Sequence, residues 1–215
     1  DGDLLVLTVG DLLRQQASTF PDSVAVTAVT ADGTLGPSWT HEQLLRDAEA
    51  LALSLASRFA PGERVVVWAP NVSRWLLMEY ACALAGLVLV TANPSFQQAE
   101  LRYVLEQSRS VALFHIESHR GNPMTAIAEE ASQGLSSVRE IIDLDNDEQL
   151  FASGPRPRSL PTVAPTDAAQ IQYTSGTTGF PKGAVLSHHS LVNNARLFAQ
   201  RALTDQNSVY ANFMP

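Results

Sequence analysis

Cysteine and charged residues are scarce in this sequence. Cys82 is the single cysteine among 215 residues, so no internal disulfide can form, and such usage is typical of a reducing compartment. We therefore expect a cytoplasmic protein. Charged residues make up 17%, and 14 basic residues are outnumbered by 22 acidic ones, for a net charge of −8. No nucleic acid partner is expected, because phosphate backbones bind clustered basic surfaces. A hydrophobic content of 45% excludes intrinsic disorder.

Targeting and membrane-spanning segments are not expected either. Residues 4–7 form a short apolar run flanked by acids, unlike a signal peptide. Residues 75–92 are mostly apolar, but Glu79 interrupts them and Gly86 divides a helix-like part from a strand-like part. A buried helix followed by a buried strand explains this pattern better than a transmembrane segment, because an acid inside a spanning helix is costly. The chain begins with Asp1 rather than Met, so we expect a piece of a longer protein.

Strand and helix patterns alternate along most of the chain. Apolar runs predict strands at 24–29, 64–68, 87–90, 111–114 and 138–144. Helical periodicity predicts helices at 44–59, 73–86 and 125–133, and one with the buried stripe Leu101, Val104 and Leu105. Helix caps are predicted at Ser73 and, as capping boxes, at Thr40 with Gln43 and at Ser95 with Gln98. The alternation predicts an α/β fold with a doubly wound, largely parallel sheet and flanking helices.

A loop rich in glycine and hydroxyl groups lies between strand-like residues 170–173 and 184–186. Its glycines allow the backbone to turn N–H groups around an anion, its hydroxyls add donors, and its lysine adds positive charge. The whole segment 168–204 contains no acid but three basic residues, as a site for an anionic ligand requires. We therefore predict a polyphosphate site with the ligands Thr174, Ser175, Gly176, Thr177, Thr178, Gly179, Lys182 and Gly183.

Three better-known nucleotide or hydrolase motifs do not fit this loop. A Walker A loop needs lysine directly after glycine and a hydroxyl residue after lysine, whereas here Gly179 precedes Phe180 and Gly183 follows Lys182. The dinucleotide pattern G-x-G-x-x-G is absent, and Ser175 lacks the glycine spacing of a hydrolase nucleophile elbow.

The loop resembles the phosphate loop of the adenylate-forming, or AMP-binding, enzymes. Residues 173–184, Tyr-Thr-Ser-Gly-Thr-Thr-Gly-Phe-Pro-Lys-Gly-Ala, are similar to that family's signature and look most like the version in fatty-acyl or medium-chain acyl-CoA synthetases. Residues 186–188 and 193–194 look like the family's continuation. Upstream, 62–65 and 93–105 lie in the family's order and spacing. The resemblance covers most of the chain.

This resemblance implies a two-step ligase reaction. A carboxylate, expected to be a fatty acid, attacks the α-phosphorus of ATP, pyrophosphate leaves, and coenzyme A then captures the acyl-adenylate. The loop would hold the β- and γ-phosphates, with Lys182 and Thr174 as the catalytic residues. Mg²⁺ would accompany ATP, but the chain offers no evident metal ligand.

Adenylate-forming enzymes are much longer than 215 residues, and the resemblance places their magnesium acid, ribose aspartate and C-terminal lysine downstream. We therefore expect the N-terminal portion of an acyl-CoA synthetase, inactive without the missing C-terminal part. The alternative is a standalone nucleotide- or partner-binding module without catalysis.

The sequence divides into three segments. We expect an α/β subdomain at 1–150, a Pro-rich linker at 151–167, and the phosphate-loop hairpin with its helix at 168–215, the start of a second, truncated α/β region. A homo-oligomer stays open.

Histidines offer two weaker candidates. His115 and His119 are four residues apart but lack the H-E-x-x-H acid, which favours loop histidines over a zinc site. His188 and His189 precede a helix expected to run to about residue 202, where they cap or pack, or else contact the acyl or nucleotide site.

Overall fold

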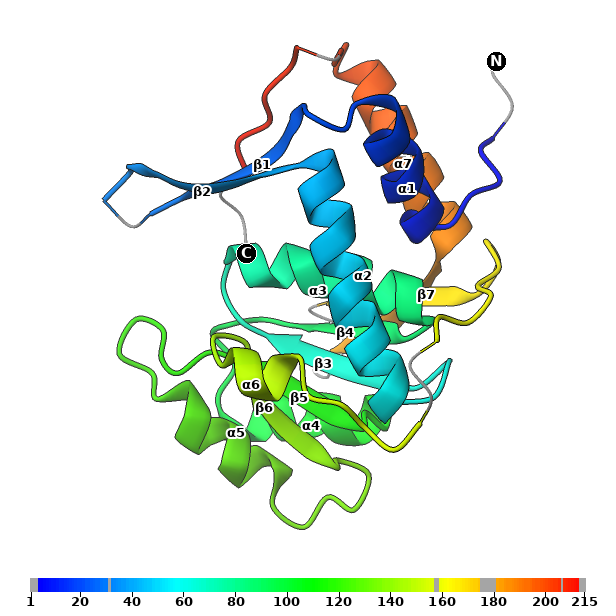
Figure 1. The fold of residues 1–215 in the computed structure, drawn as a ribbon. Helices are drawn as coiled ribbons and strands as arrows, with labels where there is room; N and C mark the ends of the chain where they lie inside the picture. The colour runs from blue at the N-terminus through cyan, green and yellow to red at the C-terminus, as the bar shows by residue number, and fades with distance from the viewer. Residues whose placement is uncertain (1–3, 31, 157–158, 175–180, 206, 213–215) are drawn as a thin grey trace.

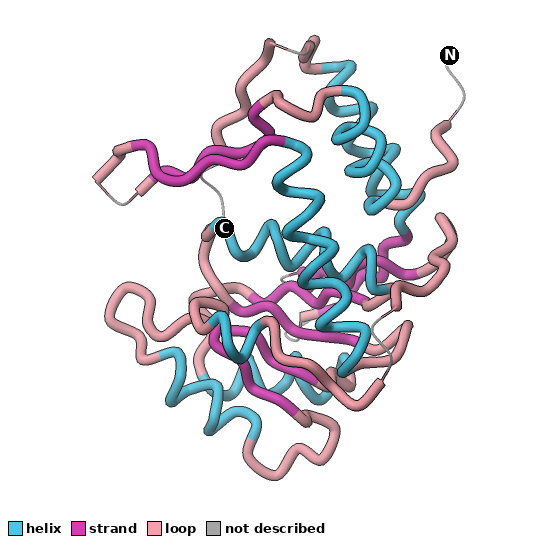
Figure 2. Tube along the Cα trace, viewed as in Figure 1, coloured by secondary structure: helices cyan, strands magenta, loops and turns pink. Residues whose placement is uncertain are grey.

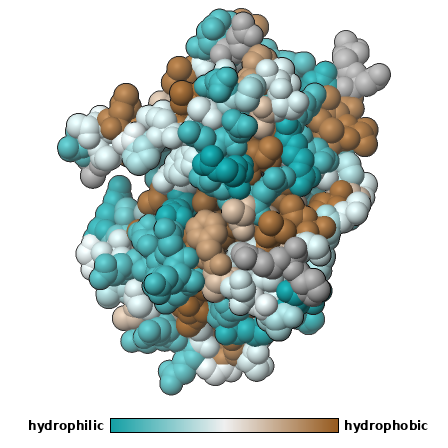
Figure 3. All heavy atoms as spheres, in the orientation of Figure 1, coloured by the Kyte–Doolittle hydropathy of each residue, from teal (hydrophilic) through white to brown (hydrophobic). Residues whose placement is uncertain are grey.

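The computed structural model describes residues 4–30, 32–156, 159–174, 181–205 and 207–212. Its centre is a six-stranded sheet with helices on both faces, and a separate two-stranded hairpin projects from the helices on one of these faces (Figures 1 and 2). The hairpin consists of β1 (Val24–Val29) and β2 (Leu35–Thr40). On the face drawn in Figure 3, hydrophilic and hydrophobic atoms are interspersed, with hydrophilic atoms prevailing at the lower left.

The sheet has the strand order β6-β5-β3-β4-β7-β8. All neighbouring pairs are parallel except β7 and β8, which are antiparallel. This confirms the predicted α/β fold with a mainly parallel sheet. The strand bounds are β3 Arg64–Trp68, β4 Val88–Ala92, β5 Ala112–His115, β6 Glu140–Asp143, β7 Ala168–Thr174 and β8 Lys182–Ser187.

The helices cover the two faces of the sheet in turn (Figure 1). One face carries α2 and α3, with α1 packed on both, and the other face carries α4 and α5. Helix α7 lies beside α1, although most of the chain separates the two in sequence. The helix bounds are α1 Val9–Thr19, α2 His41–Arg58, α3 Ser73–Ala85, α4 Gln98–Ser108, α5 Met124–Ser132, α6 Asp147–Leu150 and α7 His188–Arg201. None of the described helices has the length and apolar character needed to cross a bilayer.

The core lies on both sides of the central strand β3. Residues Val65, Val66 and Val67 are completely buried, because parallel strands between two helical layers have no solvent-facing side. Trp68, Phe59 and Phe114 are the largest side chains buried with them. An unbroken apolar run, rather than alternation, therefore marks the centre of this sheet.

Helix starts follow the predictions in one case and differ in two. Thr40 and Gln43 form the expected capping box, with reciprocal bonds of 3.2 and 3.0 Å. Ser73 is the first helical residue of α3 rather than its cap. The predicted box at Ser95 is wrong because α4 begins at Gln98 with Gln97 as its N-cap, and the Gln97 N–H donates to the Glu100 carboxylate at 3.1 Å.

Two helices were not predicted from the sequence. Helix α1 begins with a capping box in which the Asp11 N–H donates to the Thr8 hydroxyl at 3.0 Å and the Thr8 N–H to the Asp11 carboxylate at 3.2 Å. Helix α6 is a single turn within an acidic segment, and the Asn146 side chain caps it by accepting the Gln149 N–H. Beyond it, β7 pairs with β4, so the sheet continues across the Pro-rich residues. The segment boundaries at 150 and 167 stay a prediction.

Candidate functional site

A crevice is expected where β3 and β4 end. The helix after β3 lies on one face of the sheet and the helix after β4 on the other, so the two connections diverge. In doubly wound sheets, ligands bind outside the carboxyl ends of the strands at such a point. Trp68 and Ala92 are register partners, so both strands end at the same level.

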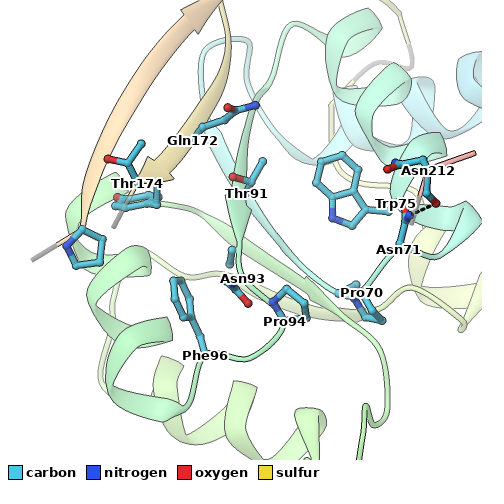
Figure 4. Close-up of a pocket in the computed structure, with 14 residues that line it drawn as sticks. Pro70, Asn71, Trp75, Thr91, Asn93, Pro94, Phe96, Gln172, Thr174 and Asn212 are labelled. Atoms are coloured by element: carbon cyan, nitrogen blue, oxygen red, sulfur yellow. Dashed lines mark hydrogen bonds between the residues drawn. The ribbon is translucent and has the colours of Figure 1, made fainter. Parts of the chain in front are cut away.

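A cavity of about 570 Å³ occupies this position (Figure 4). Its walls come from the segments that follow β3 and β4, from the end of β7, from Pro181 and from Asn212. None of the lining residues carries a charge. The polar ones are Asn71, Thr91, Asn93, Gln172, Thr174 and Asn212, together with the hydroxyl of Tyr173.

Hydrogen bonds fix the cavity walls. The buried indole of Trp68 donates to the Asn93 carbonyl at 3.0 Å, which ties the end of β3 to the turn after β4. The Asn71 amide donates to the Asn212 carbonyl at 2.8 Å, which holds the C-terminal segment at the rim (Figure 4). The rings of Trp75 and Phe96 flank the cavity from these two connections. The cavity therefore combines apolar walls with amide and hydroxyl groups.

The predicted loop begins and ends beside this cavity. Thr174 and Lys182 are the last register pair of β7 and β8, and the Thr174 hydroxyl donates to the Lys182 carbonyl at 3.4 Å. Both side chains are exposed. The other predicted ligands Ser175, Gly176, Thr177, Thr178 and Gly179 lie outside the described residues. The structure thus brings the two ends of the loop together at the carboxyl end of a strand that borders the cavity.

Lys182 has no acidic partner within the described part of the chain: it takes part in none of the ion pairs there, which all use arginine. Its ammonium group is therefore not neutralised by a described carboxylate. This fits the acid-free segment seen in the sequence.

Gly183 has a packing role. A Cβ at this position would lie 2.8 Å from Ile171 Cγ2 and 3.3 Å from Tyr173 Cζ, closer than side chains tolerate without rearrangement. Its role as a phosphate ligand stays a prediction, whereas its lack of a side chain is required by its neighbours on β7.

The histidines lie away from the cavity walls. His188 is buried at the start of α7, its Nδ1 accepts the Val9 N–H at 3.4 Å, and its burial lowers its pKa. This contact supports the packing interpretation. His115 is also buried, and its Nδ1 lies 3.0 Å from the Ile116 carbonyl oxygen. Across the described ranges, no three His, Cys, Asp or Glu side chains are grouped as metal ligands would be.

Most of the residues that build the cavity, and the contact of Tyr103 with the chain beside the loop, were not predicted from the sequence. Trp75, Phe96 and Thr91 carry no local motif, and they meet only because β3, β4 and β7 are neighbours. Tyr103 stood in a segment similar to the family, but nothing in the sequence indicated that its hydroxyl reaches Pro181.

The structure is an α/β fold with a mainly parallel sheet, and the two ends of the Gly/Ser/Thr-rich segment lie beside the crevice where β3 and β4 end. The model of the AMP-binding enzyme family matches residues 13–215, so the chain belongs to this family. It is similar to the mitochondrial medium-chain acyl-CoA ligase ACSF2 of Rattus norvegicus, with 31% identity over 94% of this chain and 37% of that protein. Among solved structures it is similar to apo MbtA of Mycobacterium smegmatis, with a TM-score of 0.83 and 27% identity over 96% of this chain and 38% of that one. VinN is also similar, with a TM-score of 0.75 and 25% identity over 94% and 49% of the two chains.

The chain spans only part of these relatives. It covers between 35% and 42% of the length of curated relatives such as the bovine ACSF2 ligase and a Bacillus subtilis acyl-CoA synthetase. The chain therefore belongs to the family, but it is much shorter than the relatives that carry the names of these activities.

Proposed function

We propose that this chain is the ATP-phosphate-binding part of an AMP-forming acyl-CoA synthetase. In the protein that contains it, a carboxylic acid and ATP form acyl-AMP and pyrophosphate, and the acyl group then passes to the thiol of coenzyme A. The observation that carries this proposal is the Thr174–Lys182 pair, which closes an acid-free Gly/Ser/Thr loop beside the crevice at the end of β7.

The proposed contribution of this chain to catalysis is electrostatic stabilisation of the leaving pyrophosphate. When the carboxylate oxygen bonds to the α-phosphorus, the bond to the bridging oxygen of pyrophosphate breaks and negative charge builds on the leaving group. Lys182 and the hydroxyl of Thr174, with the predicted loop ligands, would hold the β- and γ-phosphates and stabilise that charge. Positioned donors act most strongly where charge develops during the reaction.

Magnesium does not fit the described residues. Mg²⁺ prefers carboxylate and water oxygens, and the cavity walls contain no Asp or Glu. The described residues also provide no cluster of potential ligands. No step is therefore assigned to a metal held by this chain, and Mg²⁺ entering with ATP stays a prediction.

The substrate is proposed to be a fatty or medium-chain carboxylic acid. Support comes from the loop's likeness to acyl-CoA synthetases and from the similarity to a protein named medium-chain acyl-CoA ligase. The uncharged cavity walls with Trp75 and Phe96 suit an apolar group. A cytoplasmic location is proposed from the buried free thiol of Cys82, which suits a reducing compartment.

Pyrophosphate–ATP exchange that depends on added carboxylic acid tests the proposal. In the full-length protein that carries this chain, Lys182→Ala should lower exchange about 100-fold, because it removes a charge that contacts the leaving group. Gly179→Ala should also lower it strongly. Arg201→Ala removes the same charge from the same acid-free segment and should leave the rate within about twofold.

Two results would contradict this proposal. Unchanged exchange in both Lys182→Ala and Gly179→Ala would refute the assignment of the loop. ATP binding without any acid-dependent exchange in the wild-type protein would favour the non-catalytic binding module instead. A panel of acids of increasing chain length in the same assay would define the substrate.

A further inference from the structure

Helix α4 contacts the chain on both sides of the loop. The Tyr103 hydroxyl donates to the Pro181 carbonyl at 3.1 Å. One turn further along the same face of the helix, Gln107 Oε1 accepts the Tyr173 hydroxyl. Pro181 directly precedes Lys182 and Tyr173 directly precedes Thr174, so one helix holds both ends of the loop.

The bond to Pro181 acts directly on the backbone of Lys182. A peptide group is planar, so fixing the Pro181 carbonyl also fixes the N–H and the Cα of the next residue. Proline has no N–H, so the carbonyl is the hydrogen-bonding group by which the chain can be held at this point. The Lys182 side chain is exposed and has no described ionic partner, so its starting position depends on this backbone.

We infer that Tyr103 is a positioning residue for Lys182. Its hydroxyl holds the Pro181–Lys182 peptide so that the ammonium group projects toward the bound phosphates. The inference rests on the proposed function, because it takes Lys182 as the phosphate ligand. Tyr103 acts through the backbone and is not itself a phosphate ligand.

The surroundings of the two tyrosines suit this role. Both are half-buried and pack against the core, so their rings are held in place. Burial and the neighbouring Tyr103 raise the pKa of Tyr173 to about 12, so its hydroxyl stays a neutral donor over the working pH range. Gly183 leaves the space in which the Tyr173 ring lies beside Gln107.

Tyr103→Phe in the full-length protein is the first test. This substitution removes one hydroxyl and keeps the ring. In the acid-dependent exchange assay, kcat/KM for ATP should be about 10-fold lower, which corresponds to a loss of roughly 1.4 kcal/mol in transition-state stabilisation. KM for the carboxylic acid and the melting temperature should stay unchanged. Tyr80→Phe is the matched control, because it removes a phenol hydroxyl that bonds no described residue and should leave exchange unchanged.

A double-mutant cycle shows whether Tyr103 acts through Lys182. In a Lys182→Ala background, Tyr103→Phe should change exchange by less than about twofold, because the group that it positions is gone. In the chain itself, Tyr103→Phe should move the NMR signal of the Lys182 amide, which belongs to the same peptide as the Pro181 carbonyl, while Tyr80→Phe should not.

The outcomes separate this inference from the proposed function. If Lys182→Ala abolishes exchange while Tyr103→Phe equals the wild type, the inference fails and the function stands. The inference also fails if Tyr103→Phe lowers exchange by the same factor in the wild type and in Lys182→Ala. It fails too if Tyr103→Phe lowers kcat/KM equally for ATP and for the acid and also lowers the melting temperature. If Lys182→Ala alone leaves exchange unchanged, the inference fails, and if Gly179→Ala leaves it unchanged as well, the assignment of the loop fails with it.

Discussion

The Tyr173 ring lies over Gly183, its register partner on the neighbouring strand. Tyr173 Cζ would be 3.3 Å from a Cβ placed on Gly183, and Ile171 Cγ2 would be 2.8 Å from it. Aromatic rings often cover glycine in this way across strand pairs. The Tyr173 hydroxyl donates to Gln107 Oε1 of α4, so the absence of a side chain at 183 leaves room for the residue that joins β7 to this helix.

Gly183→Ala should therefore destabilise the protein. The added methyl group meets a β-branched side chain and an aromatic ring, and overpacking of this kind costs about 1–3 kcal/mol. Urea unfolding gives the change in the free energy of unfolding. Gly36→Ala on β2 is the matched control, since its Cβ would approach Ala28 no closer than 3.5 Å, an ordinary contact. Equal effects of the two variants would show that the packing over Gly183 is looser than the structure has it.

Much of the fold was predictable because its strongest signals are local. The buried run Val65 to Val67 and the Thr40 capping box predicted a strand and a helix start correctly. Helix α1 was missed although its local signals are present, because it has an amphipathic pattern and the Thr8–Asp11 capping box.

The site was predictable in its chemistry but not in its surroundings. Composition alone located the loop between Thr174 and Lys182, because glycines, hydroxyls and a lysine without acids are a local pattern. The cavity unites segments from five stretches of chain, and the position of β7 beside β4 is decided by sheet order. Competing caps are the other limit: Ser95 and Gln98 form a capping sequence, but Gln97 caps α4 two residues later.

Glu79 on α3 is a half-buried carboxylate with no hydrogen bond or ion pair to a described residue. Burial raises its pKa, and its charge adds to the burial that raises the pKa of Tyr80 to about 12. Because the folded protein holds this proton more tightly than the unfolded chain, the contribution of Glu79 to stability is greatest below pH 4.5 and decreases as pH rises through the folded pKa.

Glu79→Gln should raise the free energy of unfolding by about 1 kcal/mol at pH 7.5, because it removes an unpaired charge from a poorly hydrated place. It should also flatten the decrease in stability above pH 4.5. Urea unfolding between pH 4.5 and 7.5 measures both effects. Glu106→Gln, an exposed carboxylate paired with Arg102, is the control and should change stability by less than about 0.5 kcal/mol. A loss of stability in Glu79→Gln would mean that this carboxylate has a stabilising partner.

His188 should give the opposite pH dependence. Burial lowers its pKa below 6.5 and outweighs the opposing charges of Asp167 and Asp11. The unfolded chain then binds a proton that the folded protein does not, so the contribution of His188 to stability is complete above pH 6.5 and decreases as pH falls toward the folded pKa. Protonation of Nδ1 would also break its hydrogen bond with the Val9 N–H, which joins α7 to the start of α1.

His188→Asn tests this linkage. Its unfolding free energy should be about 1–2 kcal/mol below that of the wild type at pH 7.5, because the Val9 contact and ring packing are lost. The difference should shrink at pH 5.5, because only the wild type must then keep a buried imidazole uncharged. His119→Asn, in a hairpin after β5, corrects for the loss of one imidazole. Urea unfolding gives the free energy of unfolding of the three proteins at both pH values. If the wild type and His188→Asn differ in this free energy by the same amount at pH 7.5 and pH 5.5, His188 titrates alike in the folded and unfolded states and the prediction is wrong.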